Sequence, residues 1–165
     1  AGGWGHIMSD EGSGYDIGRR ILTQVMKSYD GRGIESILTK LVLGKLNIDS
    51  AEDLVSYAHG ANTGKSEIAD LGRLLDPAGF AGDEAALQIA RDAAKELFYM
   101  VQAVVNRLDF ADQGADLVLG GSVLEKGHFV KDQLILLLKS AYPNIRIKKP
   151  VYDPAWGAVL MALEQ

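Results

Sequence analysis

The residues most able to do chemistry lie close to the beginning of the sequence, in GGWGHIMSDEGSG at positions 2–14. This segment contains five glycines, a tryptophan, a histidine and the adjacent carboxylates Asp10 and Glu11. Neighbouring side chains point in different directions on any regular backbone, so these two acids do not face one bond as a glycosidase pair does. A single carboxylate beside Trp4 and flexible glycines suits a polar, hydroxylated ligand. The alternative is structural, since acidic residues also favour the N-terminus of a helix.

A second candidate site is LVLGGSV at positions 117–123. Its short apolar run ends in Gly120 and Gly121, which indicates a buried parallel strand that delivers its carboxyl end to a site. Ligands of open α/β sheets bind at that edge, and a helix beginning just beyond it can offer amides to an anion. The glycines are equally consistent with a tight turn that needs positive φ. Both interpretations stay open for this segment, which continues into Ser122.

The segment GANTGKS at positions 60–66 looks like a phosphate-binding loop but does not meet the requirements of one. Its two glycines are one residue closer together than the pattern requires. A helix is predicted before it, whereas a phosphate loop must follow a strand. We therefore interpret the segment as a turn between helices. The histidines His6, His59 and His128 show no metal-ligand spacing, and we assign no metal site and no catalytic residue within this sequence.

Composition excludes several classes of protein. The 165 residues fit one domain, or half of a two-domain protein, and 47% of them are hydrophobic, which is enough for a packed core. A net charge of −5 gives no basic footprint for nucleic acid or for an anionic membrane. No apolar stretch approaches the roughly 20 residues of a membrane-spanning helix. The absence of cysteine excludes disulfides and cysteine-held iron–sulfur clusters within the sequence and fits a cytoplasmic protein.

Helical periodicity dominates the first two thirds of the sequence. Ser13 is the expected cap of the first helix, with Asp16 in the acidic position of a capping box, and Ser50 with Asp53 forms a second box before a short helix. Residues 76–83 are expected to interrupt the helical pattern before the longest helix. The predicted helices are 14–28, 34–46, a short one ending near Ala58, 65–75 and 83–108.

The last third of the sequence changes to a β-α-β-α pattern, which forms a parallel strand pair through a right-handed crossover. The predicted elements are a strand within 115–121, a helix at 129–141, a strand within 144–149, a turn at 150–154 and a helix at 155–164. Two strands are fewer than the roughly five or six of a typical sheet. We therefore expect an α/β fold that is predominantly helical, with a small parallel sheet of about two strands packed by helices.

The segment GGWGHIMSDEGSGYDIGRR, positions 2–20, strongly resembles a motif of the N-acetylglucosamine kinase group within the BadF/BadG/BcrA/BcrD ATPase family, which belongs to the actin/hexokinase/Hsp70 superfamily. The resemblance continues through FAGDEAALQI, ADLVLGGSVLEKG and KPVYDPAWGAVLMAL, so it covers essentially the whole sequence. It implies that residues 1–165 form the C-terminal part of a ribonuclease H-like, actin-like ATPase lobe. It also implies that the N-terminal lobe and the first strands of this lobe are absent from the sequence.

In such kinases the glycine-rich loop lines the cleft between two lobes and helps to hold the amino sugar. Carried over by position, the resemblance implies that Gly3, Trp4 and Asp10 contact the sugar. Ser9 stands where the family usually has glycine, which alters the backbone of the loop but keeps the carboxylate.

The resemblance also implies nucleotide-binding positions in two later segments. The implied adenosine motif consists of Gly120, Gly121 and Ser122, and a further helix start that borders the nucleotide contains Ala81, Gly82 and Asp83. A full-length relative has two phosphate loops and a catalytic aspartate that this sequence lacks. Phosphoryl transfer depends on positioning both substrates and on charge stabilisation, so we expect the chain alone to be inactive.

The expected function is therefore that of a fragment of an ATP- and Mg²⁺-dependent kinase for N-acetylglucosamine or glucosamine. Its expected partners are the amino sugar, ATP and the missing lobe, and an exposed sheet edge would also permit a homodimer. Two alternatives stay open. One is an activator ATPase lobe of the same family, which holds an iron–sulfur cluster on cysteines that this sequence lacks. The other is a non-catalytic helical interaction module.

Overall fold

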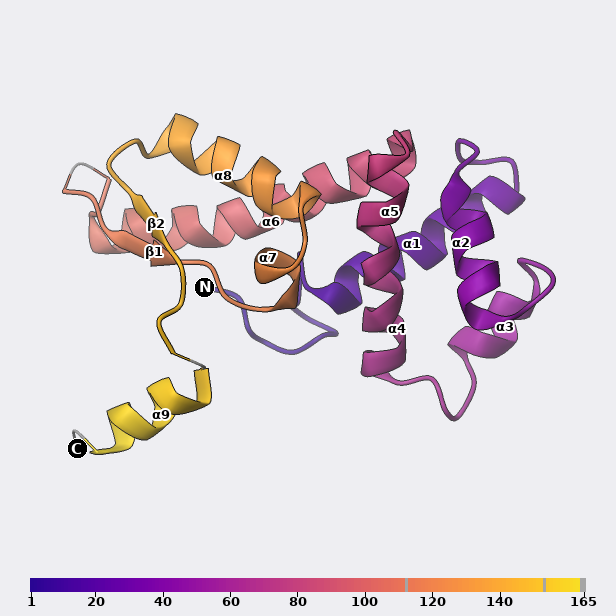
Figure 1. The fold of residues 1–165 in the computed structure, drawn as a ribbon, viewed down its shortest axis with the longest axis horizontal. Coiled ribbons are helices and arrows are strands. Elements are labelled where there is room, and N and C mark those ends of the chain that lie inside the picture. The colour runs from indigo at the N-terminus through magenta and orange to yellow at the C-terminus, as the bar shows by residue number, and fades with distance from the viewer. Residues whose placement is uncertain (112, 153, 164–165) are drawn as a thin grey trace.

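The computed structural model describes residues 1–111, 113–152 and 154–163, which form a mostly helical fold with one two-stranded parallel sheet (Figure 1). The α-helices are α1 Gly14–Tyr29, α2 Ile37–Leu46, α3 Asp53–Ala58, α4 Lys65–Leu71, α5 Leu75–Phe80, α6 Glu84–Leu108, α7 Ser122–Glu125, α8 Phe129–Ala141 and α9 Pro154–Leu163. A 3₁₀ turn, Gly72–Leu74, joins α4 to α5, and the strands are β1 Asp116–Val118 and β2 Arg146–Lys148. The expected fold class, predominantly helical with a small parallel sheet, is confirmed.

Helix α1 begins where the sequence predicts, at a cap formed by Ser13. The Ser13 hydroxyl accepts the backbone N–H of Asp16 at 3.2 Å. The Asp16 carboxylate does not complete the reciprocal box, because it accepts the N–H of Gly12 at 3.1 Å and the side chain of Arg20 at 2.8 Å. These contacts tie the glycine-rich loop to the first turn of α1, and they keep a nearly buried carboxylate paired.

Helices α1 and α4 cross at very short range because glycine occupies the contact positions. A Cβ atom at Gly18 would lie 1.9 Å from the carbonyl oxygen of Ile68 on α4. A Cβ at Gly72 would lie 2.8 Å from the carbonyl oxygen of Gly14. Only a residue without a side chain permits this approach, which places α4 directly beside the start of α1.

The long helix α6 is the central support of the fold, and Figure 1 shows it running alongside α8. Its buried N-terminal half is rich in alanine, which brings neighbouring elements close. The buried residues of α6 are Ala85, Ala86, Ile89, Ala90, Ala93, Ala94 and Val105. Its cap, Asp83, accepts the N–H of Ala86 at 2.9 Å and also the N–H of Ile37 at 2.8 Å, so one carboxylate caps both α6 and α2.

The predicted break over residues 76–83 is wrong for most of its length. Helix α5 runs through it, because Pro77 falls in the first turn, where a helix does not need the missing N–H. The chain leaves helical geometry only between α5 and α6, where Gly82 has a φ of +77°. Similarly, α2 begins at Ile37 after a Ser36 cap rather than at residue 34, and the Asp53 carboxylate accepts the N–H and hydroxyl of Ser50 just before α3.

The parallel pairing of the two strands is confirmed, with Leu117 opposite Ile147 and α8 in the crossover between them. The expectation that the first strand is buried is wrong, since Asp116 and Val118 are exposed and only Leu117 is half-buried. Parallel sheets are normally covered on both faces by helices. In the part of the chain that the structure describes, the sheet has two strands, and the first and last residues of both strands are exposed.

Helix α9 lies apart from the helical body in Figure 1, at the end of the extended segment that follows β2. It has no charged residue between Pro154 and Leu163, and most of its large apolar side chains are exposed. Those side chains are Trp156, Val159, Leu160, Met161 and Leu163. Asp153 and Glu164, which belong to the predicted turn and final helix, lie outside the described residues. Within the described ranges, no helix is both long and apolar enough to cross a membrane.

Candidate functional site

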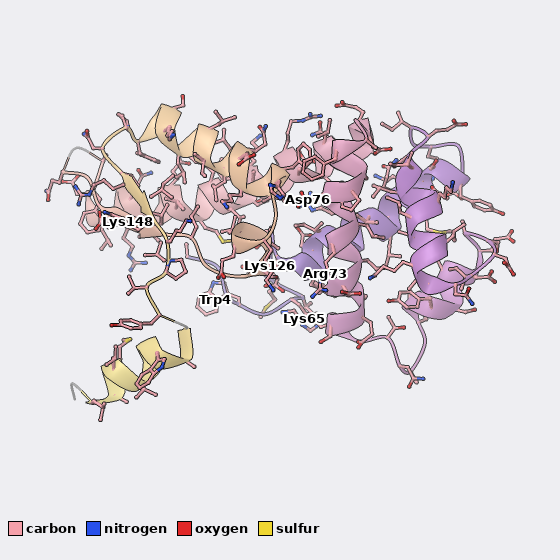
Figure 2. The ribbon with its side chains drawn as sticks, in the orientation of Figure 1. Trp4, Lys65, Arg73, Asp76, Lys126 and Lys148 are labelled. Carbon is pink, nitrogen blue, oxygen red and sulfur yellow. The ribbon has the colours of Figure 1, made fainter. Side chains whose placement is uncertain are left out.

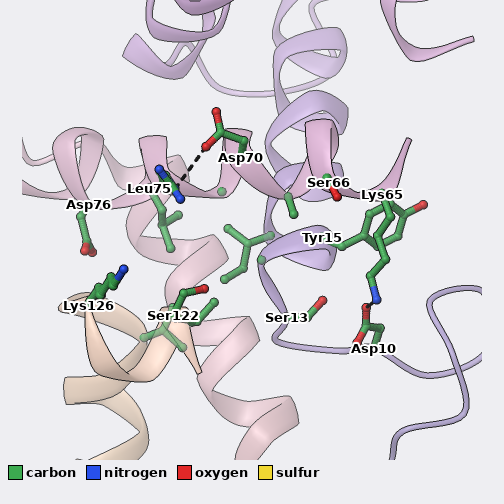
Figure 3. A pocket seen from close by; sticks show the side chains of 18 residues that line it. Asp10, Ser13, Tyr15, Lys65, Ser66, Asp70, Leu75, Asp76, Ser122 and Lys126 are labelled. Carbon is green, nitrogen blue, oxygen red and sulfur yellow. Dashed lines mark ion pairs between the residues drawn. The ribbon is translucent and has the colours of Figure 1, made fainter. Parts of the chain in front are cut away.

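A cavity of about 630 Å³ opens between the start of α1, the α4–α5 segment and the short helix α7 (Figure 3). Asp10 and Ser13 lie on its N-terminal side, and Ser122 and Lys126 lie on the opposite side. The contact glycines of α1 and α4 determine how closely these walls approach. Residues separated by more than 100 positions in the sequence therefore share one concave surface, as expected of a ligand site.

Asp10 forms an ion pair with Lys65, the first residue of α4, across one end of the cavity. The Lys65 Nζ atom lies 2.7 Å from Asp10 Oδ2, and the Asp10 side chain is 26% exposed. The Lys65 ammonium holds the pKa of the Asp10 carboxyl below its ordinary value, because a nearby cation favours the ionised form. The negative charge expected at Asp10 from the sequence is thus present, and it already has a partner.

The turn after β1 contains Gly120 and Gly121 and leads into Ser122, the one residue of these three that lines the cavity. Gly121 has a φ of +90°, which L-residues rarely adopt, so the turn requires glycine at this position. The Gly121 N–H donates to the Glu125 carboxylate at 2.7 Å and is therefore engaged within its own turn. What the turn offers a ligand is close approach to its backbone and the hydroxyl of Ser122, which lines the cavity.

Three basic side chains line the same cavity: Lys65, Arg73 and Lys126 (Figure 2). Arg73 Nε lies 3.2 Å from the Asp70 carboxylate, which also pairs with Lys45 of α2 at 2.6 Å. These two cations hold the pKa of the Asp70 carboxyl below its ordinary value, and Lys45 has the larger effect. The N-terminal end of α1 adds a partial positive charge at Ser13 and Gly14. Three carboxylates, those of Asp10, Asp70 and Asp76, balance these cations in the lining, and Asp10 and Asp70 pair with Lys65 and Arg73.

Asp76 is a cavity residue that the sequence reasoning missed. Its carboxylate accepts the N–H of His128 at 2.9 Å and that of Phe129 at 3.3 Å, and it thereby caps α8 from α5. The available signal was a negative one: α8 follows Gly127 and His128, with no Ser, Thr, Asp or Asn to cap it. A helix that lacks a local cap indicates a cap supplied from elsewhere in the fold.

A second cavity, of about 410 Å³, lies within the glycine-rich loop on the other side of Asp10. Its lining includes His6, Glu11 and Arg19, and the His6 ring packs edge-on against Tyr15 with ring centroids 5.2 Å apart. The loop closes through a turn in which Ser9 donates its N–H to the Gly5 carbonyl at 2.8 Å. The polar side chains around this smaller cavity suit a ligand with hydroxyl and amide groups.

Of the predicted site residues, only Asp10 and Ser122 line a cavity, and the others lie outside both linings. Trp4 is 72% exposed on the loop, and Gly3 beside it has a φ of +81°. Ala81 and Gly82 form the turn between α5 and α6, where the adjacent Asp83 acts as a helix cap. Among the residues that the structure describes, no three His, Cys, Asp or Glu side chains gather into a metal-binding group.

Comparison with known proteins identifies the family to which this fold belongs. The chain superimposes with a TM-score of 0.72 on the crystal structure of a candidate N-acetylglucosamine kinase from Chromobacterium violaceum, at 27% identity over 97% of this chain and 50% of that one. The fold is accordingly that of part of an actin-like ATPase. The model of the BadF/BadG/BcrA/BcrD ATPase family matches residues 1–162, and the chain belongs to this family.

Two curated relatives are kinases by description. The N-acetylmuramic acid/N-acetylglucosamine kinase of Clostridium acetobutylicum is 39% identical over 98% of this chain and 53% of its own length. The N-acetyl-D-glucosamine kinase of Dictyostelium discoideum is 35% identical over 99% of this chain and 52% of its own length. The chain therefore spans about half the length of the curated relatives that it matches.

Proposed function

We propose that this chain supplies part of the substrate-binding machinery of an ATP-dependent amino-sugar kinase of the N-acetylglucosamine or glucosamine type. The observation that carries the proposal is the cavity that joins Asp10 to Ser122, because it brings the expected sugar loop and the expected adenosine motif to one surface. The kinases that are 39% and 35% identical to the chain support the same reaction class.

The larger cavity is the proposed nucleotide site. In this proposal the base and ribose lie against the Gly120–Ser122 turn, and the phosphates point toward Lys65 and the start of α1. Cationic side chains and a helix N-terminus are the groups that stabilise phosphates in proteins. The assignment of Ala81 and Gly82 to the border of the nucleotide stays a prediction, since their turn is outside the cavity lining.

The smaller cavity is the proposed sugar site. The Asp10 carboxylate would accept sugar hydroxyl groups there, and Trp4 and Gly3 would cover the sugar from the loop once it is bound. Carbohydrate sites combine acceptors for hydroxyls with an aromatic surface for the apolar face of the ring. Asp10 lines both cavities, so it would stand where the sugar meets the nucleotide.

Both proposed cofactors fit the residues present. Lys65, Arg73 and Lys126 of the larger cavity are cations that could hold the phosphates of ATP, which supplies the transferred phosphoryl group. Mg²⁺ in such enzymes binds substrate phosphates and only one or two carboxylates, so it does not require a preformed group of protein ligands. The carboxylates on the cavity are Asp10, Asp70 and Asp76, and Asp10, beside Lys65, could serve it.

We further propose that the rest of the polypeptide, a second lobe together with the first strands of this lobe, completes the enzyme and covers the sheet and α9. Val118 on β1 and Trp156 on α9 are more than half exposed, whereas parallel sheets are normally enclosed by helices. Apolar surface of this kind marks an interface. The length of the curated relatives, about twice the matched segment, supports a second lobe as the occupant in preference to a second copy of this chain.

The test is a coupled kinase assay and calorimetric titration with N-acetylglucosamine, ATP and Mg²⁺. It compares the 165-residue chain with the full polypeptide that contains it. We expect phosphorylation by the full polypeptide, with weak binding and no turnover by the chain alone. Lys126→Met should raise the KM for ATP in the active form about tenfold, or about 1.4 kcal/mol, whereas Lys139→Met on the exposed side of α8 should not. A full polypeptide that binds neither ligand would instead favour an interaction module.

A further inference from the structure

Asp10 is the point at which the two cavities meet. Of the residues that line them, Asp10 and Tyr15 are common to both. Lys65, in contrast, lines only the larger cavity and reaches the Asp10 carboxylate from that side. A single ion pair thus connects the surface proposed for the nucleotide with the surface proposed for the sugar.

The Asp10–Lys65 pair has the properties of an exchangeable contact. The Lys65 side chain is 51% exposed, and partly exposed ion pairs contribute little to stability. The lysine ammonium is a compact charge on a flexible stem, so it can turn to a neighbouring anion without a backbone movement. Arg73, the other cation of the α4–α5 wall, is instead held by Asp70, which Lys45 also anchors.

We propose that Lys65 is a positioning residue that couples the two substrates. When the larger cavity is empty, the Lys65 ammonium engages the Asp10 carboxylate. When a nucleotide fills the cavity, its phosphates attract the ammonium, and the carboxylate becomes available to accept hydroxyl groups of the sugar. This inference rests on the proposed function, because it requires a nucleotide in the larger cavity and a sugar in the smaller one.

The arrangement of the cavity indicates which part of the nucleotide would lie near Lys65. In Figure 3, Lys65 and Asp10 lie at one end of the cavity and Ser122 with Lys126 at the other. A nucleotide held by its base at the Gly120–Ser122 turn therefore extends its phosphates toward Lys65. Coupling between two ligands is reciprocal, so the nucleotide raises sugar affinity by the same factor by which the sugar raises nucleotide affinity.

The test measures this coupling in the full kinase that contains the chain. N-acetylglucosamine is titrated calorimetrically with and without Mg²⁺ and a non-hydrolysable ATP analogue. For the wild type we expect the analogue to increase sugar affinity about fivefold, within the usual range of coupling energies. Lys65→Met should increase sugar affinity without nucleotide about fivefold, weaken analogue binding and abolish the coupling. Lys65→Arg should retain the coupling, and Lys139→Met on the exposed end of α8 serves as the control.

The increase in sugar affinity is the decisive readout, because a merely structural role for Lys65 would lower it or leave it unchanged. Thermal melting confirms that each variant is folded. If the wild type binds the two ligands independently, the coupling proposal is wrong and the proposed function still holds. The same conclusion follows if Lys65→Met weakens sugar binding. A wild type that binds neither ligand overturns both.

Discussion

The carboxylate of Asp76 on α5 caps α8 by accepting the N–H of His128 at 2.9 Å, although the two residues are 52 positions apart in the sequence. This bond joins two walls of the candidate nucleotide cavity, since α5 and the segment before α8 both line it. The Phe80 ring packs edge-on against Phe129 beside it, with centroids 5.0 Å apart. The shape of the cavity thus depends on a cap supplied by tertiary structure.

Asp76→Ala should lower the free energy of unfolding by about 1–2 kcal/mol, which is typical of losing a helix cap. Asp76→Asn should lower it less, because the amide oxygen can still accept one N–H. Urea denaturation measures both changes. Asp49→Asn, which alters an exposed carboxylate outside the cavity, is the matched control and should leave the stability within about 0.5 kcal/mol of the wild type. Equal stability of Asp76→Ala and wild type would contradict the capping role.

Gly18→Ala should destabilise the fold strongly, because the new Cβ would lie 1.9 Å from the Ile68 carbonyl oxygen. Helices α1 and α4 would have to separate, at a cost of about 1–3 kcal/mol or more. Gly44→Ala is the matched control in α2, where a Cβ meets nothing within 4 Å and improves helix propensity by up to about 1 kcal/mol. Thermal unfolding should therefore shift in opposite directions for the two variants. A shift of the same sign would contradict the close-crossing account.

The stability of the chain in acid should depend, by a small amount, on the partly exposed Asp10–Lys65 pair. The folded-state pKa of Asp10 lies below its ordinary value of 3.8, so the stabilisation is present above that value. It is lost as the pH falls from there through the lower folded-state pKa. Between pH 6 and pH 3, the wild type should therefore lose more stability than Lys65→Met, as measured by urea denaturation at each pH. Parallel pH profiles for the two proteins would contradict this pairing in solution.

Most of the helices were predictable because their apolar residues repeat at helical spacing, as in Ile17, Ile21 and Val25 of α1. The predicted break at 76–83 failed because Pro77 is compatible with a first helical turn, a position that sequence alone did not reveal. The prediction that β1 is buried was wrong. Its apolar run indicates a strand that is covered by other elements, but it does not show whether those elements belong to this sequence. The Asp10–Lys65 contact depends on tertiary packing and has no local sequence signal. The missing local cap of α8 indicates a distant cap but does not identify Asp76 as the residue that supplies it.

Trp4 should report sugar binding by fluorescence, because it is 72% exposed on the loop that carries the proposed sugar contacts. Saturating N-acetylglucosamine should change the emission of the full kinase, and Trp4→Phe should remove that change. The sequence has two tryptophans, so Trp156→Phe is the natural control and should keep the response. A response that disappears with Trp156 and persists without Trp4 would place the sugar elsewhere.

The central claim is that Asp10 holds the amino sugar beside a nucleotide bound in the larger cavity. The most direct measurement is the steady-state phosphorylation of N-acetylglucosamine by the full kinase, compared for wild type, Asp10→Asn and the control Asp49→Asn. We expect Asp10→Asn to reduce kcat/KM for the sugar by about 100-fold, or about 2.7 kcal/mol, because a neutral amide accepts sugar hydroxyls less strongly. Asp49→Asn should match the wild type. An Asp10→Asn enzyme with unchanged kcat/KM, or a wild type without phosphorylation, would contradict the account.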